Sequence, residues 1–125
     1  MNGIQRMRIL SREDHEPEMN ERVASLANDD DPFALKDRLA RLDRIDLHFP
    51  QFTDGRAYSQ AYLLRKRLGF KGDVRATGDV LIDQLVQMAR TGFSSAVLKE
   101  GVDVEDAERQ FARFAGYYQN DLAPD

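Results

Sequence analysis

The chain has no cysteine, and this absence removes several kinds of chemistry from consideration. It excludes a disulfide framework, a thiolate nucleophile, a thiolate-bound iron–sulfur cluster and a cysteine zinc site. The only two histidines, His15 and His48, have no partner at a metal-binding spacing such as i, i+4. We therefore expect no metal site and no resident cofactor, so that a redox role would need a cofactor supplied from elsewhere.

Long apolar runs are also missing. No stretch approaches the roughly 20 apolar residues that cross a bilayer. The N-terminal stretch MNGIQRMRILSRED has no apolar run of signal-peptide length before its charges. We expect a cytoplasmic protein without a membrane segment. At 125 residues the chain is long enough for one domain with its own core.

Charge is abundant and unevenly distributed. The net charge is −4, yet residues 33–72 carry nine Lys/Arg against four Asp, which gives this segment +5. We call residues 33–72 the basic island. Its three consecutive cations, Arg65, Lys66 and Arg67, are candidates for docking an acidic partner, and the island could also attract a small anion. The acidic total and the lack of interleaved aromatics argue against nucleic acid, and a solvated helix face is the plain alternative.

Apolar residues recur with helical and strand periods in alternation. Helical spacing predicts helices over 32–42, 57–68, 80–91 and from 104 onward. Asp31, Asp79 and Asp103 stand where N-caps are expected. Period two predicts strands over 21–27, 44–49, 73–77 and 95–99. The order predicts an α/β fold, with about four successive strand–helix units and a mainly parallel sheet. We expect one domain over residues 21–125, preceded by a flexible N-terminal extension, residues 1–20.

The predicted strands put polar side chains at alternate positions, among them Asp46, His48 and Arg75. Parallel strands buried on both faces are usually continuously apolar, so one face of this sheet is expected to be polar. Such a face suits a half-barrel or an interface with a second copy of the chain, and we expect a homodimer. An open flavodoxin-like sheet is the alternative architecture.

Functional residues of parallel α/β folds gather where strands end and helices begin. Here that edge includes FPQFTDGRAYSQA, residues 49–61. We predict a small-anion site in which Arg56 and Ser59 lie near a helix N-terminus and Arg75 closes the site. The residues expected to shape it are Asp54, Gly55, Tyr58 and Asp79. The alternative is structural, with an Asp-Gly turn, a helix cap and ion pairs. The sequence identifies no catalytic residue.

A longer segment, FPQFTDGRAYSQAYLLRKRLGFKGDVRATGDVLIDQLVQMARTGF, residues 49–93, resembles the signature of a bacterial family, domain of unknown function 934. The matching positions are Phe49, Pro50, Phe52, Asp54, Gly55, Arg56, Tyr58, Ser59, Arg65, Arg75, Gly78, Asp83, Gln84 and Arg90. The resemblance implies an accessory protein of assimilatory sulfite reduction, because family members are encoded beside the haem-containing sulfite reductase. Many members carry an oxidoreductase label. Where members often have a cysteine and an acidic residue, this chain has Thr91 and Ser94, which excludes a mechanism through that thiol.

Two functions of different classes follow. The resemblance implies an adaptor that binds the haem-containing reductase subunit, its electron donor or the sulfite anion. The strand-end segment alternatively suggests a small enzyme that performs acid/base chemistry on an anionic metabolite. An adaptor should co-purify with the reductase, whereas an enzyme should bind a small ligand near Asp54 and Ser59.

Overall fold

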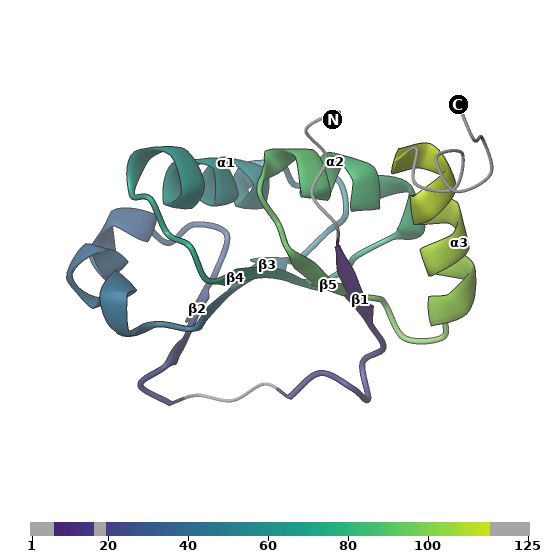
Figure 1. The fold of residues 1–125 in the computed structure, drawn as a ribbon, viewed down its shortest axis with the longest axis horizontal. Helices are drawn as coiled ribbons and strands as arrows, with labels where there is room; N and C mark the ends of the chain where they lie inside the picture. Colours follow the sequence, from purple (N-terminus) through teal and green to yellow (C-terminus); the bar gives the residue numbers. More distant parts are fainter. Residues whose placement is uncertain (1–6, 17–19, 116–125) are drawn as a thin grey trace, which may run out of the picture.

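The computed structural model describes residues 7–16 and 20–115. Within them lies one five-stranded sheet (Figure 1). The strands are β1 (Arg8–Leu10), β2 (Val23–Leu26), β3 (Arg44–Phe49), β4 (Asp73–Gly78) and β5 (Ser95–Val97). They lie in the order β1-β5-β4-β3-β2, and every pairing is parallel. The predicted α/β class with a mainly parallel sheet is confirmed.

Helical segments follow the strands. They are η1 (Pro32–Arg41), α1 (Arg56–Tyr62) continued by η2 (Leu63–Arg67), η3 (Ile82–Gln84) continued by α2 (Leu85–Thr91), and α3 (Val104–Ala115). In Figure 1, α1 and α2 lie over the same face of the sheet, while η1 and α3 lie toward its two ends. Strands β2 to β5 are successive neighbours, so right-handed crossovers place their connections on one face. The sheet is covered by helices from one side, as in a half-barrel.

Two of the predicted helices differ in kind from the expectation. Residues 32–41 form a 3₁₀ helix, although Asp31 caps it as predicted by accepting the Phe33 N–H at 3.0 Å. The helix that starts with α1 ends in a π turn, in which the Leu68 N–H donates to the Leu63 carbonyl at 2.9 Å. Apolar spacing separates helices from strands, but it does not resolve which hydrogen-bond pattern a helix adopts.

Asp79 is not the N-cap that its position suggested. The helix after β4 begins only at Ile82. The Asp79 carboxylate instead accepts the N–H of Phe52 at 2.9 Å and lies 3.5 Å from Lys99 Nζ. This N–H belongs to the loop after the neighbouring strand, so the tertiary contact takes the place of the local cap. Asp103 does cap α3, through the Glu105 N–H at 3.0 Å.

The hydrophobic core lies between the sheet and the helices above it. The strands contribute Ile45, Leu47, Phe49, Val74 and Ala76, and the helices contribute Ala61, Leu64, Leu85 and Met88, all fully buried. The Phe49 ring lies 5.2 Å from that of Tyr58 and 5.8 Å from that of Phe93. Full burial of a large apolar side chain stabilises a fold by about 1.5–3 kcal/mol. The core therefore holds the sheet to its helices and leaves the polar groups to the edges and the opposite face.

Strand β1 lies within residues 1–20, the stretch expected to precede the domain. It pairs with β5, with Arg8 opposite Ser95 and Leu10 opposite Val97. Three residues are too few to show a period, so the sequence pattern did not reveal this strand. The chain that leaves β1 lies on the face without helices, where His15 and Glu16 contact Arg75 and Arg44 (Figure 1).

The face opposite the helices is polar, as the alternation predicted. Arg75 and Asp46 are register partners, and they are only 4% and 5% exposed. Asp46 accepts from Arg44 Nε at 2.8 Å, and Arg44 also donates to the carbonyl of Glu16, in the segment after β1, at 2.9 Å. These polar positions thus have partners inside the chain, and the homodimer stays a prediction.

Candidate functional site

At the carboxyl edge of the sheet, where the parallel strands end, the Asp54 carboxylate accepts several hydrogen bonds from its neighbours. It accepts the Arg56 N–H at 3.0 Å, Arg56 Nη2 at 3.0 Å and Arg56 Nε at 3.2 Å. Asn28 also donates to it. The side-chain hydrogen bonds from Arg56, helped by its backbone N–H, lower the pKa of Asp54 to about 2. The positive charge of Arg56, predicted to bind an anion, is thereby paired with a carboxylate of the same turn.

Asp79 joins two loops of the same edge. Its bond to the Phe52 N–H ties the end of β4 to the loop after β3. Gln84 adds a bond from its side-chain amide to the Phe52 carbonyl. Lys99, which follows β5, lies within ion-pair distance of Asp79 at 3.5 Å. These contacts assign Asp79 a structural role in holding the loops together.

The other residues predicted at this edge serve the fold or face solvent. Ser59 is exposed on α1, past the first turn of that helix. Gly55 precedes α1 with φ −87°, and a Cβ there would meet nothing within 4 Å. Tyr58 packs edge-on against Phe49, and its buried hydroxyl has no hydrogen-bond partner among the described residues. Burial raises the pKa of Tyr58.

Arg75 lies on the polar face of the sheet, away from the carboxyl-edge loops. Its Nε donates to Ser95 Oγ at 2.9 Å, and its Nη2 donates to Asp73 Oδ2 at 3.1 Å. Its Nη1 lies 3.1 Å from His15 Nδ1. Burial lowers the pKa of Arg75, and Asp73 opposes that shift. The structure therefore does not bring Arg75 together with Arg56 and Ser59.

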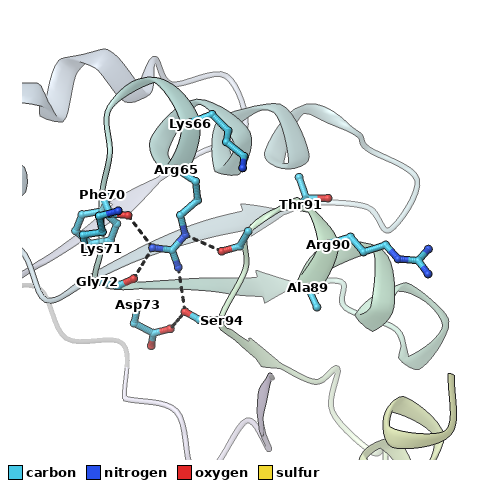
Figure 2. Close-up of a pocket in the computed structure, with 11 residues that line it drawn as sticks. Arg65, Lys66, Phe70, Lys71, Gly72, Asp73, Ala89, Arg90, Thr91 and Ser94 are labelled. Atoms are coloured by element: carbon cyan, nitrogen blue, oxygen red, sulfur yellow. Dashed lines mark hydrogen bonds between the residues drawn. The ribbon is translucent and has the colours of Figure 1, made fainter. Parts of the chain in front are cut away.

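The opposite edge of the sheet, where the strands begin, holds a cavity of about 730 Å³ (Figure 2). It lies between η2 and the C-terminal end of α2. Its lining residues are Arg65, Lys66, Phe70, Lys71, Gly72, Asp73, Ala89, Arg90, Thr91, Gly92 and Ser94. We call this cavity the amino-edge pocket. Helices run antiparallel to the strands that they follow, so the helix C-termini meet at this edge.

Arg65 forms the floor of the amino-edge pocket. Its Nε donates to the Gly92 carbonyl at 2.9 Å, and its Nη1 donates to the carbonyls of Phe70 and Gly72 at 2.9 and 2.8 Å. A longer bond of 3.4 Å joins Nη2 to Ser94 Oγ. Arg65 thus supplies donors to three backbone carbonyls near the helix ends. Burial lowers the pKa of its guanidinium. A side chain used in this way is not available for the partner docking that the sequence suggested.

Two glycines of the pocket have no room for a side chain. Gly92 ends α2 with φ 124°, and a Cβ at this position would lie 2.7 Å from Arg65 Cγ. At Gly72 a Cβ would lie 2.7 Å from the Asp43 carbonyl oxygen. Contacts below about 3.0 Å force a neighbour to move. The position of Arg65 therefore depends on the absence of a side chain at Gly92, whereas Gly72 leaves room for Phe70 and the Asp43 carbonyl.

The remaining cations of the pocket are exposed and unpaired. The side chains of Lys66, Lys71 and Arg90 make no ion pair or hydrogen bond with any residue that the structure describes. The carboxylate of Asp73 is used by Arg75, Ser94 and Ser95. Four cations line the pocket against one carboxylate, which leaves it with a net charge of +3. This excess lies in a chain whose total charge is −4.

Sequence reasoning did not find the amino-edge pocket, although two signals pointed to it. The predicted helix ends at Gly69 and Gly92 both fall at the edge where strands begin, and the basic island ends there as well. Arg90 is outside the island, and its place beside Lys66 depends on how α1 and α2 pack, which no local pattern gives.

The described residues contain no cluster of three or more metal-binding side chains. Among the helices of residues 7–16 and 20–115, none is long and apolar enough to cross a membrane.

The fold and the site together define a small α/β protein, with helices on one side of a parallel sheet and a cationic pocket at its amino edge. The chain belongs to the family described as "Bacterial protein of unknown function (DUF934)", whose model matches residues 23–125. This confirms the resemblance seen in residues 49–93. No curated protein and no solved structure matches the chain.

Proposed function

We propose that this protein is a cytoplasmic accessory or adaptor protein of assimilatory sulfite reduction, and that it docks an acidic surface of the haem-containing reductase subunit. The choice of pathway rests on the resemblance of residues 49–93 to the family signature. The choice of docking surface rests on the geometry of the basic island.

The observation that carries the proposal is that the three consecutive cations differ in their contacts. Arg65 is used inside the molecule for three backbone carbonyls. Lys66 and Arg67 are exposed, and within the described residues they have no partner. Exposed charges without local partners steer association with an oppositely charged surface and raise its rate. These two side chains are therefore the docking contacts.

The first experiment is a pull-down from host cells grown on sulfate as the sole sulfur source, with the tagged protein as bait. The adaptor function predicts recovery of the haem-containing reductase subunit. Repeating the experiment at higher salt should reduce recovery, because exposed charge pairs are screened. Failure of the wild-type bait to recover the reductase would contradict the adaptor function.

A pair of charge-reversal variants tests the docking surface. The Lys66→Glu/Arg67→Glu variant should lose most of the recovered reductase. Its matched control is Lys36→Glu/Arg41→Glu, which reverses two exposed cations of the same island on η1. Both variants change the net charge by the same amount, so equal losses would show a dependence on total charge and contradict the assigned surface.

We further propose a homodimer, which the polar strand positions first suggested and which the exposure of Phe52 supports. Phe52 is 44% exposed on the loop after β3, whereas Phe49 is fully buried in the core. A standard-size interface should persist at tens of micromolar, roughly the range of sedimentation experiments. A monomer under those conditions would contradict the homodimer and leave the adaptor function untouched.

A further inference from the structure

We propose that the amino-edge pocket binds a small organic anion that carries two or more carboxylate or phosphate groups. This site lies at the opposite edge of the sheet from Asp54 and Ser59. The proposal goes beyond the adaptor function and does not depend on it, because the ligand is a small molecule and the site is a cavity of this chain alone.

The size and lining of the pocket favour an organic ligand over an inorganic ion. Its volume of about 730 Å³ lies within the range of about 300–1,000 Å³ that is typical of small-molecule sites. Phe70 and Ala89, which are 4% and 3% exposed, contribute a small apolar area, and the aliphatic stems of Lys66 and Lys71 add to it. A ligand with a carbon skeleton would contact this apolar surface, whereas a single inorganic oxyanion would not.

The charges of the pocket favour more than one acidic group. The unpaired cations come from three separate segments: Lys66 from η2, Lys71 from the turn before β4, and Arg90 from the end of α2. In Figure 2 Lys66 extends toward Thr91, Lys71 lies on the far side of Arg65, and Arg90 reaches outward past Thr91. Cations so separated match a ligand whose acidic groups are also separated.

A purely structural account of these cations is incomplete. Basic side chains at helix C-termini commonly offset the helix dipole and bond the last carbonyls. Here Arg65 makes those bonds, and its donors are largely used by them. Lys66 and Arg90 make none with the described residues, and Lys71 is not on a helix. Hydrogen bonding to the terminal carbonyls of the helices therefore does not account for the charges of Lys66, Lys71 and Arg90.

The pocket is also built in advance of any ligand. The Arg65 bonds fix its floor, and Gly92 makes room for that side chain. The π turn of η2 widens the helix where Arg65 and Lys66 project, and π turns inside helices occur often at functional sites. A fixed site loses less conformational entropy on binding than one that must first order itself.

The test uses isothermal titration calorimetry of the whole protein with citrate, an organic tricarboxylate, and with pyrophosphate, which presents two linked phosphate groups as an organic diphosphate does. Two or three charge-assisted contacts predict dissociation constants in the range of about 1 µM to 1 mM at low salt. Acetate, with one acidic group, should bind at least about ten-fold more weakly than citrate. Absence of citrate and pyrophosphate binding up to about 10 mM would overturn the proposal.

Three single variants locate the binding. Lys71→Ala and Arg90→Ala remove exposed cations that line the pocket, and each should weaken citrate or pyrophosphate binding about ten-fold or more. Arg67→Ala removes an exposed cation of the same island that does not line the pocket, and it should change binding by less than about two-fold. Thermal unfolding of all three should match that of the wild type, since each side chain is exposed.

Two other outcomes would overturn the proposal. An equal loss in Arg67→Ala would show diffuse attraction to a basic surface, with no site. Binding of an oligoglutamate peptide, with none of citrate or pyrophosphate, would assign the pocket to a protein partner. The pull-down with the wild-type bait does not measure small-anion binding, and Lys71 and Arg90, the pocket cations tested, are not docking contacts, so the adaptor function and the small-anion site can fail separately.

Discussion

The two edges of the sheet both gather charged side chains, but they use them differently. At the carboxyl edge Asp54 pairs with Arg56, and Asp79 lies within ion-pair distance of Lys99. At the amino edge Arg65 is used for backbone carbonyls, while Lys66 and its pocket neighbours have no acidic partner among the described residues. Convergence of polar residues is therefore a weak sign of a site. A stronger sign is a group of charged side chains that have no oppositely charged partner within the fold.

The largest expected effect comes from removing the guanidinium that forms the pocket floor. Arg65→Met should lower the free energy of unfolding by about 3 kcal/mol, because three backbone carbonyls lose their donors. Arg67→Met, at an exposed position two residues further along the helix, should lower the free energy of unfolding by less than about 0.5 kcal/mol. Urea unfolding measures both. Equal stabilities would mean that the Arg65 bonds contribute nothing and that its side chain is as free as its neighbour's.

The next effect separates backbone strain from contact with Arg65. Gly92→Ala places a side chain at φ 124° and against Arg65 Cγ, and should cost about 2–4 kcal/mol. Gly101→Ala also has a positive φ, of 90°, but its Cβ would lie in open space, and it should cost about 1–2 kcal/mol. The difference between the two in denaturant unfolding reports the contact. A larger loss for Gly101→Ala would mean that the contact of a side chain at position 92 with Arg65 adds no cost.

A smaller effect is expected at the carboxyl edge. Asp79→Ala removes the acceptor of the Phe52 N–H and should destabilise the protein by about 1–2 kcal/mol. Citrate or pyrophosphate binding measured on the same sample should be unchanged, because Asp79 is far from the amino-edge pocket in the fold. Loss of anion binding without loss of stability would mean that the anion binds at the carboxyl edge and not in the amino-edge pocket.

The smallest effect concerns the polar face, where the contact between His15 and Arg75 depends on pH. His15 faces Arg75, Arg44 and Asp46, and burial lowers its pKa from the ordinary value of 6.5, with both arginines acting in the same direction and Asp46 against it. The folded state therefore binds fewer protons than the unfolded state near that pH, and stability should fall as pH drops below about 6.5. His15→Asn should flatten this part of the curve in urea unfolding measured between about pH 7.5 and 5. An identical slope in both proteins would remove His15 as the cause.

Much of the fold could be read from the sequence because strand and helix periods are strong in this chain. The strand predicted over 44–49 has the bounds of β3, and the polar alternation of Asp46 and Arg75 does mark the face without helices. Asp31 and Asp103 cap their helices as expected. These features depend on residues close in sequence, which is where pattern reasoning works.

The rest depended on contacts between distant residues. Asp79 accepts a hydrogen bond from the Phe52 N–H of another loop and does not cap the helix that follows it. Arg75 lies on the polar face, where it contacts Ser95 and His15. The amino-edge pocket exists because Arg65 reaches the carbonyl of Gly92 from a different helix. Spacing gives the face on which a side chain lies, but it does not give the partner that it finds there.

The position of β1 has a consequence for how the chain is made. This strand leaves the ribosome before the other four, yet its partner β5 is the last strand of the sheet to be synthesised, with β2, β3 and β4 between them in sequence. Strands β2 to β4 can pair in the order of their synthesis, whereas β1 must wait for almost the whole domain. Pairing across so long a loop is slow, because the entropy of closing the loop must be overcome before the contact forms. A nascent chain stalled before residue 95 would therefore expose the edge of β4 where β5 belongs, and with it a template for pairing with another chain.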